Sequence, residues 1–320
     1  WQLLGRSIPR LDTLDKIAGK PVFGVDVEVP GMLHAAIRAC PVFGGRLQAH
    51  DASAVERRPG VVRVVALDDA VAVVAQSWWQ AQQALDALPV KWDAAGQDGI
   101  DDARIRAELE AGLTTGDAVT VTERGRPDSV LKAAERRIEA TFHAPYLAHA
   151  TMEPMTCTAA VHDDGRVEIW VPTQNAMSSL QAAARTAGVD PRRVEVHNTQ
   201  LGGGFGRRGA NQDFTEQAVR IARAVGRPVK LMWSREKDMQ HDFYRPASMA
   251  HLAAAVDDRG RLTGMTARVA APSILTSLGM KAADGHDPVA VSYTHLRAHE
   301  TLGSISYAVF CLKKGGGGGG

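Results

Sequence analysis

The chain has 320 residues, with 37 basic and 36 acidic side chains and a formal net charge of +1. Its length suffices for two or three globular domains. Because positive charge is not in excess and no polybasic stripe stands out, the composition argues against a nucleic-acid partner. No window approaches the roughly 18 apolar residues of a transmembrane helix, so no transmembrane segment is expected. The three cysteines form no CxxC pair, which argues against a disulfide framework.

The first part of the chain has the pattern of a compact α/β domain. Residues 1–12 are predicted to be a lead-in segment, since "WQLLGRSIPR" lacks the features of a signal peptide. Within residues 13–93, four β-rich runs separated by Gly and Pro turn signals predict strands: "VFGVDVEV", "MLHAAIRA", "VVRVVAL" and "AVAVVA". Ser77 is expected to begin a helix over "WWQAQQALDAL", and Pro89 to restart an extended segment. The polar, weakly patterned residues 94–136 are predicted to be a linker.

A second domain is predicted over residues 137–290. The "DDGR" turn between two alternating runs indicates a hairpin. Two segments have helical composition, "AMSSLQAAARTAG", which should end at Gly188, and "NQDFTEQAVRIARAVG". "RRVEVHNTQ" and "VKLMW" are expected to be strands.

The last segment, residues 291–320, shares no composition or periodicity with the rest and ends in six glycines. Its parts "VSYTHLRAHET" and "ISYAVFCLKK" resemble in-frame translations of short-read sequencing adapters. We therefore expect this segment to be an assembly artefact and exclude it from fold reasoning. The natural sequence is expected to be interrupted at about Ala290, with further sequence also missing before Trp1.

The stretch "TQLGGGFGRRG", residues 199–209, is the most informative part of the chain. Glycines lack Cβ atoms, so backbone N–H groups can converge on an anion, and a following helix adds its positive end. This favours a phosphate or pyrophosphate ligand, although a crowded turn would also require glycines. Residues 204–209 match GxGxxG, and Glu236 follows the next strand, which keeps a nicotinamide-dinucleotide site open. Two bulky arginines at the variable positions argue against that site.

Other candidate sites are weaker. His143, His149 and Glu153 do not have the spacing of a known metal-ligand motif, so structural histidines are favoured. The stretch from Ser234 to Pro246 mixes charges with aromatic residues, which is typical of a solvated loop with one anchored ring.

Several segments, in order, resemble the molybdenum-binding large subunit of the xanthine dehydrogenase and aldehyde oxidase family. Within that family they are most similar to the isoquinoline 1-oxidoreductase branch, at its beta subunit. They span Arg6 to Ala290 and are "RLDTLDKIAGKPVFGVDVEVPGMLHAAI", "YLAHATMEPMTCTA", "WVPTQN", "LGGGFGRR" and "GRPVKLMWSREKDMQHDFYRP". The resemblance implies an α+β fold. A hammerhead domain over residues 13–93 would be followed by the first part of a molybdopterin-binding domain over residues 137–290.

The resemblance also implies site residues. Gln174 would hydrogen-bond an oxo ligand of molybdenum, and the glycine loop would contact the pterin cofactor through Gly203, Gly204, Phe205, Gly206 and Arg207. No protein side chain would bind the molybdenum, which is held through the pterin. The family's glutamate general base lies in a C-terminal half that this chain lacks. Gly209 replaces a substrate-facing glutamate of xanthine dehydrogenases, which argues against a purine substrate.

The implied activity is oxidation of N-heteroaromatic compounds or aldehydes with oxygen taken from water. The expected cofactor is molybdopterin, in its cytosine dinucleotide form. Electrons would pass to a small iron–sulfur partner subunit carrying 2Fe-2S clusters, and this fragment alone is expected to be inactive. A nicotinamide-dependent dehydrogenase and a noncatalytic scaffold remain alternatives. Cytoplasm and periplasm both remain open as the cellular compartment.

Overall fold

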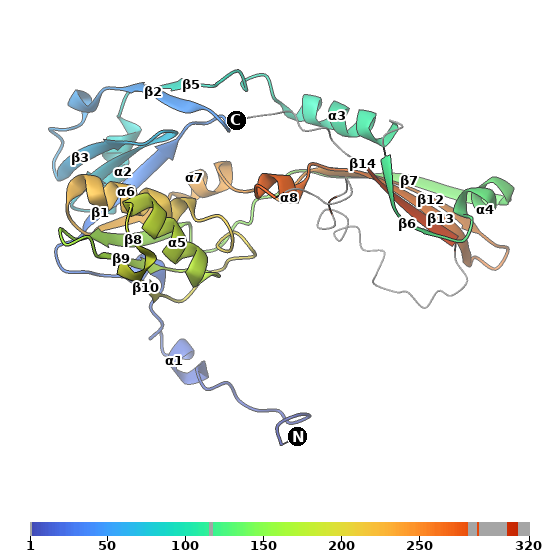
Figure 1. Ribbon diagram of the computed structural model, residues 1–320, viewed down its shortest axis with the longest axis horizontal. Helices are drawn as coiled ribbons and strands as arrows, with labels where there is room; N and C mark the ends of the chain where they lie inside the picture. The colour runs from blue at the N-terminus through green and yellow to red at the C-terminus, as the bar shows by residue number, and fades with distance from the viewer. Residues whose placement is uncertain (1, 115–117, 281–286, 288–305, 313–320) are drawn as a thin grey trace. The chain divides into compact units, whose positions relative to one another are not determined.

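A computed structural model describes residues 2–114, 118–280, 287 and 306–312 (Figure 1). The helices are α1 (Thr13–Ile17), α2 (Trp78–Asp86), α3 (Asp102–Thr114), α4 (Pro127–Ala133), α5 (Ala176–Ala187), α6 (Asp213–Val225), α7 (Arg235–Gln240) and α8 (Ile274–Ser277), with short 3-10 helices η1 (Gly24–Asp26), η2 (Ala52–Ala54) and η3 (Pro191–Arg193). The strands are β1 (Leu33–Ala39), β2 (Arg46–His50), β3 (Val61–Ala66), β4 (Ala70–Ala75), β5 (Val90–Asp93), β6 (Ala118–Arg124), β7 (Arg136–Ala144), β8 (Thr156–Val161), β9 (Val167–Val171), β10 (Val194–Asn198), β11 (Val229–Met232), β12 (Ser248–Val256), β13 (Leu262–Ala270) and β14 (Ser306–Leu312).

The chain forms two compact units, each built from two separate stretches. The first unit comprises residues 1–98 and 149–243, and the second comprises 99–148 and 244–320. The predicted domain boundaries follow chain order, whereas these units interleave along the chain. The predicted hammerhead segment therefore shares one unit with most of the region that contains the glycine loop.

The first unit is organised around a seven-stranded mixed sheet with the order β10-β9-β8-β11-β1-β4-β3. Alternate residues of a strand face opposite sides of its sheet. Ile37 and Val74 accordingly belong to a core with α5 and α6, whereas Ala36 and Val73 belong to a second core with α2. The sheet is thus covered on both faces, which explains why all six residues of β4 are buried.

The local signals in this unit behave as the sequence predicts. The Ser77 and Asn175 side chains accept hydrogen bonds from the first turns of α2 and α5. Gly188 ends α5 with a φ of 71°, in the left-handed region that glycine tolerates. The hairpin at "DDGR" is confirmed, because β8 and β9 pair antiparallel on either side of it.

Two local predictions differ from the structure. The run "VFGVDVEV", predicted to be a strand, instead contains η1, in which the Asp26 carboxylate accepts from the backbone N–H of Phe23 at 3.0 Å. Gly24 lies so close to Thr156 and Pro172 that a Cβ would approach them to 2.6 and 2.7 Å. The predicted linker, residues 94–136, contains α3, β6 and α4. These elements are weakly amphipathic, and their few apolar residues, such as Leu109 and Leu131, are buried only by tertiary packing.

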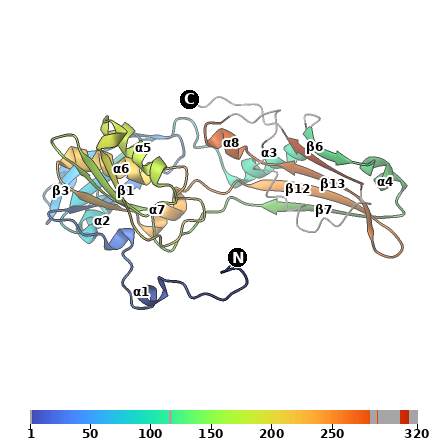
Figure 2. The same cartoon turned by 60° about the horizontal axis from the view of Figure 1, so that its bottom comes forward.

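The second unit has a five-stranded sheet with the order β6-β14-β13-β12-β7, and its strands run side by side in both views (Figure 2). Helices α3 and α4 both contact β12 and β13. The predicted artefact segment, residues 291–320, lies outside the described residues except for β14. Strand β14 pairs parallel with β13 and antiparallel with β6.

Candidate functional site

The glycine loop, residues 199–209, connects the edge strand β10 to α6. Gly203 and Gly206 have φ angles of 104° and 106°, and Phe205 also has a positive φ, 52°. A Cβ on Gly204 would lie 2.5 Å from Oε1 of Gln174, which no real contact permits. The glycines thus allow the loop to pass close to its own chain, while the Phe205 side chain is 76% exposed.

Gln174 binds the loop through its carbonyl oxygen. Its Oε1 accepts hydrogen bonds from the backbone N–H groups of Gly206, at 3.0 Å, and Arg208, at 3.3 Å. Because both partners are donors, the orientation of the amide is fixed. The Nε2 group of this exposed side chain remains a donor without a protein partner in the described part of the chain. Gln174 can therefore present N–H groups to a ligand at the loop.

Arg208 and Glu153 fix the glycine loop through hydrogen bonds to its backbone. The fully buried Arg208 side chain donates to the carbonyl oxygens of Gly203, Pro172 and Glu153. The Glu153 carboxylate accepts from the N–H groups of Val25 and Gly202, both at 3.1 Å, and lies 3.4 Å from the Arg208 guanidinium. Because these buried charges have hydrogen-bond partners, the loop conformation is fixed by the protein itself.

A second group of charged residues, most of them buried, lies around Arg207. We call it the ionic cluster, and it consists of Arg207, Asp213, Lys237, Asp238 and Asp242. Nη2 of Arg207 lies 2.9 Å from Asp213, and Nε of Arg207 lies 2.7 Å from Asp242, though without good hydrogen-bond direction. Aromatic rings surround the guanidinium, contributed by Phe214, Trp233 and Phe243.

Lys237 is an unusual member of the ionic cluster. Its Nζ has no hydrogen-bond partner in the described residues and lies 4.4 Å from the centre of the Trp233 ring. Burial lowers the pKa of Lys237 to about 7, against the raising effect of Asp213. Burial together with the charge of Lys237 lowers the pKa of His241 to about 4. Lys237 within the ionic cluster and His241 beside it make the charge of this region sensitive to pH.

Asp242 connects the ionic cluster to the segment before the loop. Its Oδ2 accepts from the backbone N–H of His149, at 2.6 Å, and lies 2.8 Å from the His149 ring nitrogen Nδ1. Burial raises the pKa of Asp242, but the hydrogen bonds from His149 and the charge of Arg207 outweigh burial and hold it below its ordinary value. Of the histidine and glutamate candidates singled out in the sequence, His149 thus orients the Asp242 carboxylate, and Glu153 binds the glycine loop at Gly202.

The structure brings the predicted loop residues and Gln174 together, with one difference. The side chain of Arg207 is only 1% exposed and lies in the ionic cluster, so it is not available to a ligand at the loop surface. The sequence predicts a solvated loop from Ser234 to Pro246, and this is wrong for Lys237, Asp238 and Asp242, each less than 9% exposed. The aromatic residues flanking these charges are the signal for burial.

The geometry also bears on the GxGxxG match. A dinucleotide fold places the loop between neighbouring parallel strands, with free backbone N–H groups facing the phosphates. Here β9 and β8 separate β10 from β11, and Gln174 already occupies the N–H groups of Gly206 and Arg208. These features weigh against nicotinamide-dinucleotide binding at this loop.

A hollow of about 430 Å³ lies beside the loop. It is lined by the first turns of α5 and α6, including Asn175, Ser178 and Asn211, and by Phe243. Its mostly polar lining provides hydrogen-bonding groups next to Gln174 and the end of the loop.

Comparison with known proteins identifies the class to which this site belongs. Residues 113–279 match the sequence profile described as "Molybdopterin cofactor-binding domain", a range that includes Gln174 and the whole glycine loop. The chain belongs to this family. It is homologous to molybdenum-dependent oxidoreductases, as the motifs predict.

Two relatives and two solved structures illustrate the similarity. The chain is 33% identical to the beta subunit of isoquinoline 1-oxidoreductase from Brevundimonas diminuta over 87% of this chain and 37% of that protein. It is 30% identical to a subunit of nicotinate dehydrogenase from Pseudomonas putida over 79% of this chain and 21% of that protein. The fold matches quinoline 2-oxidoreductase from Pseudomonas putida 86 with a TM-score of 0.68 and 18% identity, over 96% of this chain and 44% of that chain. It also matches aldehyde oxidoreductase from Desulfovibrio gigas with a TM-score of 0.66 and 18% identity, over 95% of this chain and 38% of that chain.

The chain thus spans less than two fifths of the length of these two relatives. The prediction of a mixed α and β fold is confirmed by the match to the solved structures. Both relatives are named as subunits, which is consistent with a partner subunit. In the part of the chain that the structure describes, no helix is long and apolar enough to span a membrane.

Proposed function

We propose that this chain forms part of the large subunit of a molybdenum hydroxylase and that the glycine loop contacts the molybdopterin cofactor. The observation that carries the proposal is Gln174, whose Oε1 is bound by the loop while its Nε2 donors have no partner among the described residues. The loop provides a fitting surface, because Gly203 and Gly206 have left-handed backbones and Phe205 is exposed. The loop's shape is set by Glu153 and Arg208, so a cofactor would meet a preorganised surface.

The bound cofactor would supply two-electron oxidation with oxygen derived from water. Gln174 would donate a hydrogen bond to an oxo ligand of the cofactor and stabilise negative charge there, without itself binding the metal. The exposed ring of Phe205 would exclude water from one side of the reacting centre. The buried Glu153 carboxylate serves the loop, because it accepts from Val25 and Gly202 and pairs with Arg208.

The finer points of the proposal rest on the relatives. Their names include isoquinoline and nicotinate as compounds acted upon, which supports an N-heteroaromatic substrate or an aldehyde for this chain. Gly209 offers no side chain to bind a purine. We further propose the cytosine dinucleotide form of the cofactor, an iron–sulfur partner subunit with 2Fe-2S clusters, and a hammerhead domain over residues 13–93.

The test is to produce the complete gene product together with its partner subunit and to measure molybdenum by mass spectrometry and dye reduction with N-heteroaromatic compounds and aldehydes. We expect about one molybdenum per large subunit. Gln174→Ala should keep the metal and lower turnover by roughly 10²–10³-fold, the usual effect of removing such a donor. Gln83→Ala, at an exposed position on α2, is the control. An active complex without molybdenum would contradict the proposal.

A further inference from the structure

The exposed face of β9 and β10 carries a group of ionisable residues apart from the glycine loop. The two strands are parallel, and their register places Glu195 opposite Glu168 and His197 opposite Trp170. Since alternate residues share a face, all four side chains lie on the same side of the sheet. The intervening residues face the core beneath α5 and α6: Val167, Ile169, Val171 and Val194.

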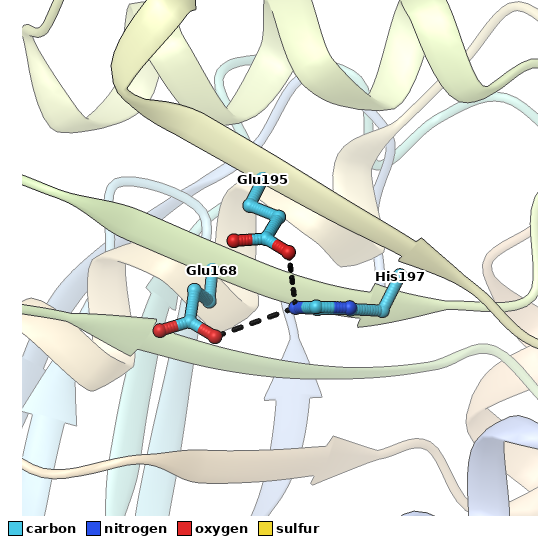
Figure 3. Close-up of side chains that lie close together, drawn as sticks. All are labelled: Glu168, Glu195 and His197. Atoms are coloured by element: carbon cyan, nitrogen blue, oxygen red, sulfur yellow. Dashed lines mark hydrogen bonds and ion pairs between the residues drawn. The ribbon is translucent and has the colours of Figure 1, made fainter.

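Three of these side chains point toward one spot, and we call them the edge cluster: Glu168, Glu195 and His197 (Figure 3). Nε2 of His197 lies 3.3 Å from Oε2 of Glu168 and 3.6 Å from Oε1 of Glu195. One atom from each residue lies within 4.8 Å of the other two. In a tetrahedral zinc site with bonds of 2.0–2.1 Å, ligand atoms are about 3.4 Å apart. The edge cluster is close to that spacing.

Neighbouring residues hold two of the three ligands in place. The Trp170 ring stacks on the His197 ring, with 4.7 Å between the ring centres and 13° between the ring planes. This stacking fixes the direction in which Nε2 of His197 points. Oε1 of Glu168 lies 2.9 Å from Nε2 of His162 and is also bound by Arg166. These contacts leave Oε2 of Glu168 facing His197, and such outer contacts are what orient ligands in metal sites.

The charge balance of the edge cluster points to a cation. Like charges directly opposite each other on neighbouring strands are destabilising. Arg166 pairs with Glu168, whereas the ionic partner of Glu195 is His197, at 3.6 Å, a side chain that Glu195 shares with Glu168. The Glu195 side chain is 59% exposed, so it can move the last few tenths of an ångström toward a bound ion.

We propose that the edge cluster binds one divalent transition-metal ion of the Zn²⁺ type through Glu168, Glu195 and His197, with water completing the coordination. One imidazole and two carboxylates suit Zn²⁺, whereas Mg²⁺ and Ca²⁺ prefer oxygen ligands alone. The site is independent of the molybdopterin proposal, because it shares no residue with the glycine loop.

The experiment is a calorimetric titration, with zinc chloride, of the complete gene product together with its partner subunit, after loosely bound metals are removed with a chelator. We expect one ion per chain at the edge cluster and at least tenfold weaker binding in His197→Gln and in Glu195→Gln. His251→Gln is the matched control, because His251 is a partly exposed strand histidine that lies 3.8 Å from a single carboxylate, Glu139. It should bind zinc as the unmodified chain does.

A second readout distinguishes coordination from general electrostatic attraction. Cobalt(II) in place of zinc should give visible absorption bands of a low-coordinate site in the unmodified chain and in His251→Gln, but not in His197→Gln. Circular dichroism should show that each variant is folded, and the exposed Glu195→Gln carries the test if His197→Gln is not. Equal zinc affinity in the folded variants and the unmodified chain, or Mg²⁺ binding as tightly as Zn²⁺, would overturn the proposal.

Discussion

Two adjacent arginines support the glycine loop in opposite ways. Arg208 donates to several main-chain carbonyl oxygens and pairs with Glu153. Arg207 lies among carboxylates and aromatic rings, where its Nε and Nη1 and the Nζ of Lys237 lack well-directed hydrogen bonds in the described residues. The comparison teaches that neighbouring residues of one type can serve different ends. The first fixes a backbone shape, whereas the second belongs to a charged group whose balance depends on pH.

The largest expected effect comes from removing the arginine that fixes the loop. Arg208→Met should lower the free energy of unfolding by about 3–5 kcal/mol, because the buried Glu153 carboxylate would lose its oppositely charged partner and several buried carbonyl oxygens would lose a donor. The measurement is the midpoint of urea unfolding. Arg192→Met is the control, since its side chain is 90% exposed and pairs with Asp190 at the surface. Equal midpoints for the two variants would contradict the role given to Arg208.

A smaller effect is expected from adding one methyl group to the loop. Gly204→Ala would place a Cβ 2.5 Å from Oε1 of Gln174, so the amide must move away and give up the hydrogen bonds from Gly206 and Arg208, at a cost of about 0.5–1.5 kcal/mol for each bond. In the complete enzyme the molybdenum content should fall as well. Gly99→Ala is the control, because a Cβ there meets nothing within 4 Å. Full stability and metal content in Gly204→Ala would show that the close approach is not required.

The effect that is smallest over a single pH unit concerns the pH response of the ionic cluster. Folding lowers the pKa of Lys237 from its ordinary value of 10.5 to about 7, so between these values the unfolded chain holds more protons than the folded one. Stability should therefore rise with pH across this window, by at most about 1.4 kcal/mol per pH unit for one proton. Lys237→Met should remove this part of the slope.

Urea unfolding at pH 7, 8 and 9 measures that slope, and substitution of the exposed Lys91 by Met is the control. The same slope in Lys237→Met and in the unmodified chain would show that Lys237 is not the titrating group. If Lys237→Met loses this part of the pH slope while the Lys91 variant keeps it, the pH dependence of stability comes from the ionic cluster.

The sequence by itself determined the elements with strong local signals. Ser77, Asn175 and Gly188 mark helix ends through hydrogen bonds and backbone freedom that depend only on nearby residues. The "DDGR" hairpin follows from a turn between alternating runs, and the motifs around Gln174 and the glycine loop were sufficient to indicate the family.

Tertiary structure alone decided how these pieces work together. The burial of Lys237 and Asp242 depends on partners from distant parts of the chain, Asp213 for Lys237 and His149 for Asp242, in addition to the aromatic residues beside them. The link between Glu153, Val25 and Gly202 joins three distant segments, and the edge cluster arises only from the register of β9 against β10. Such contacts follow from packing between distant segments, which no local pattern of residues specifies.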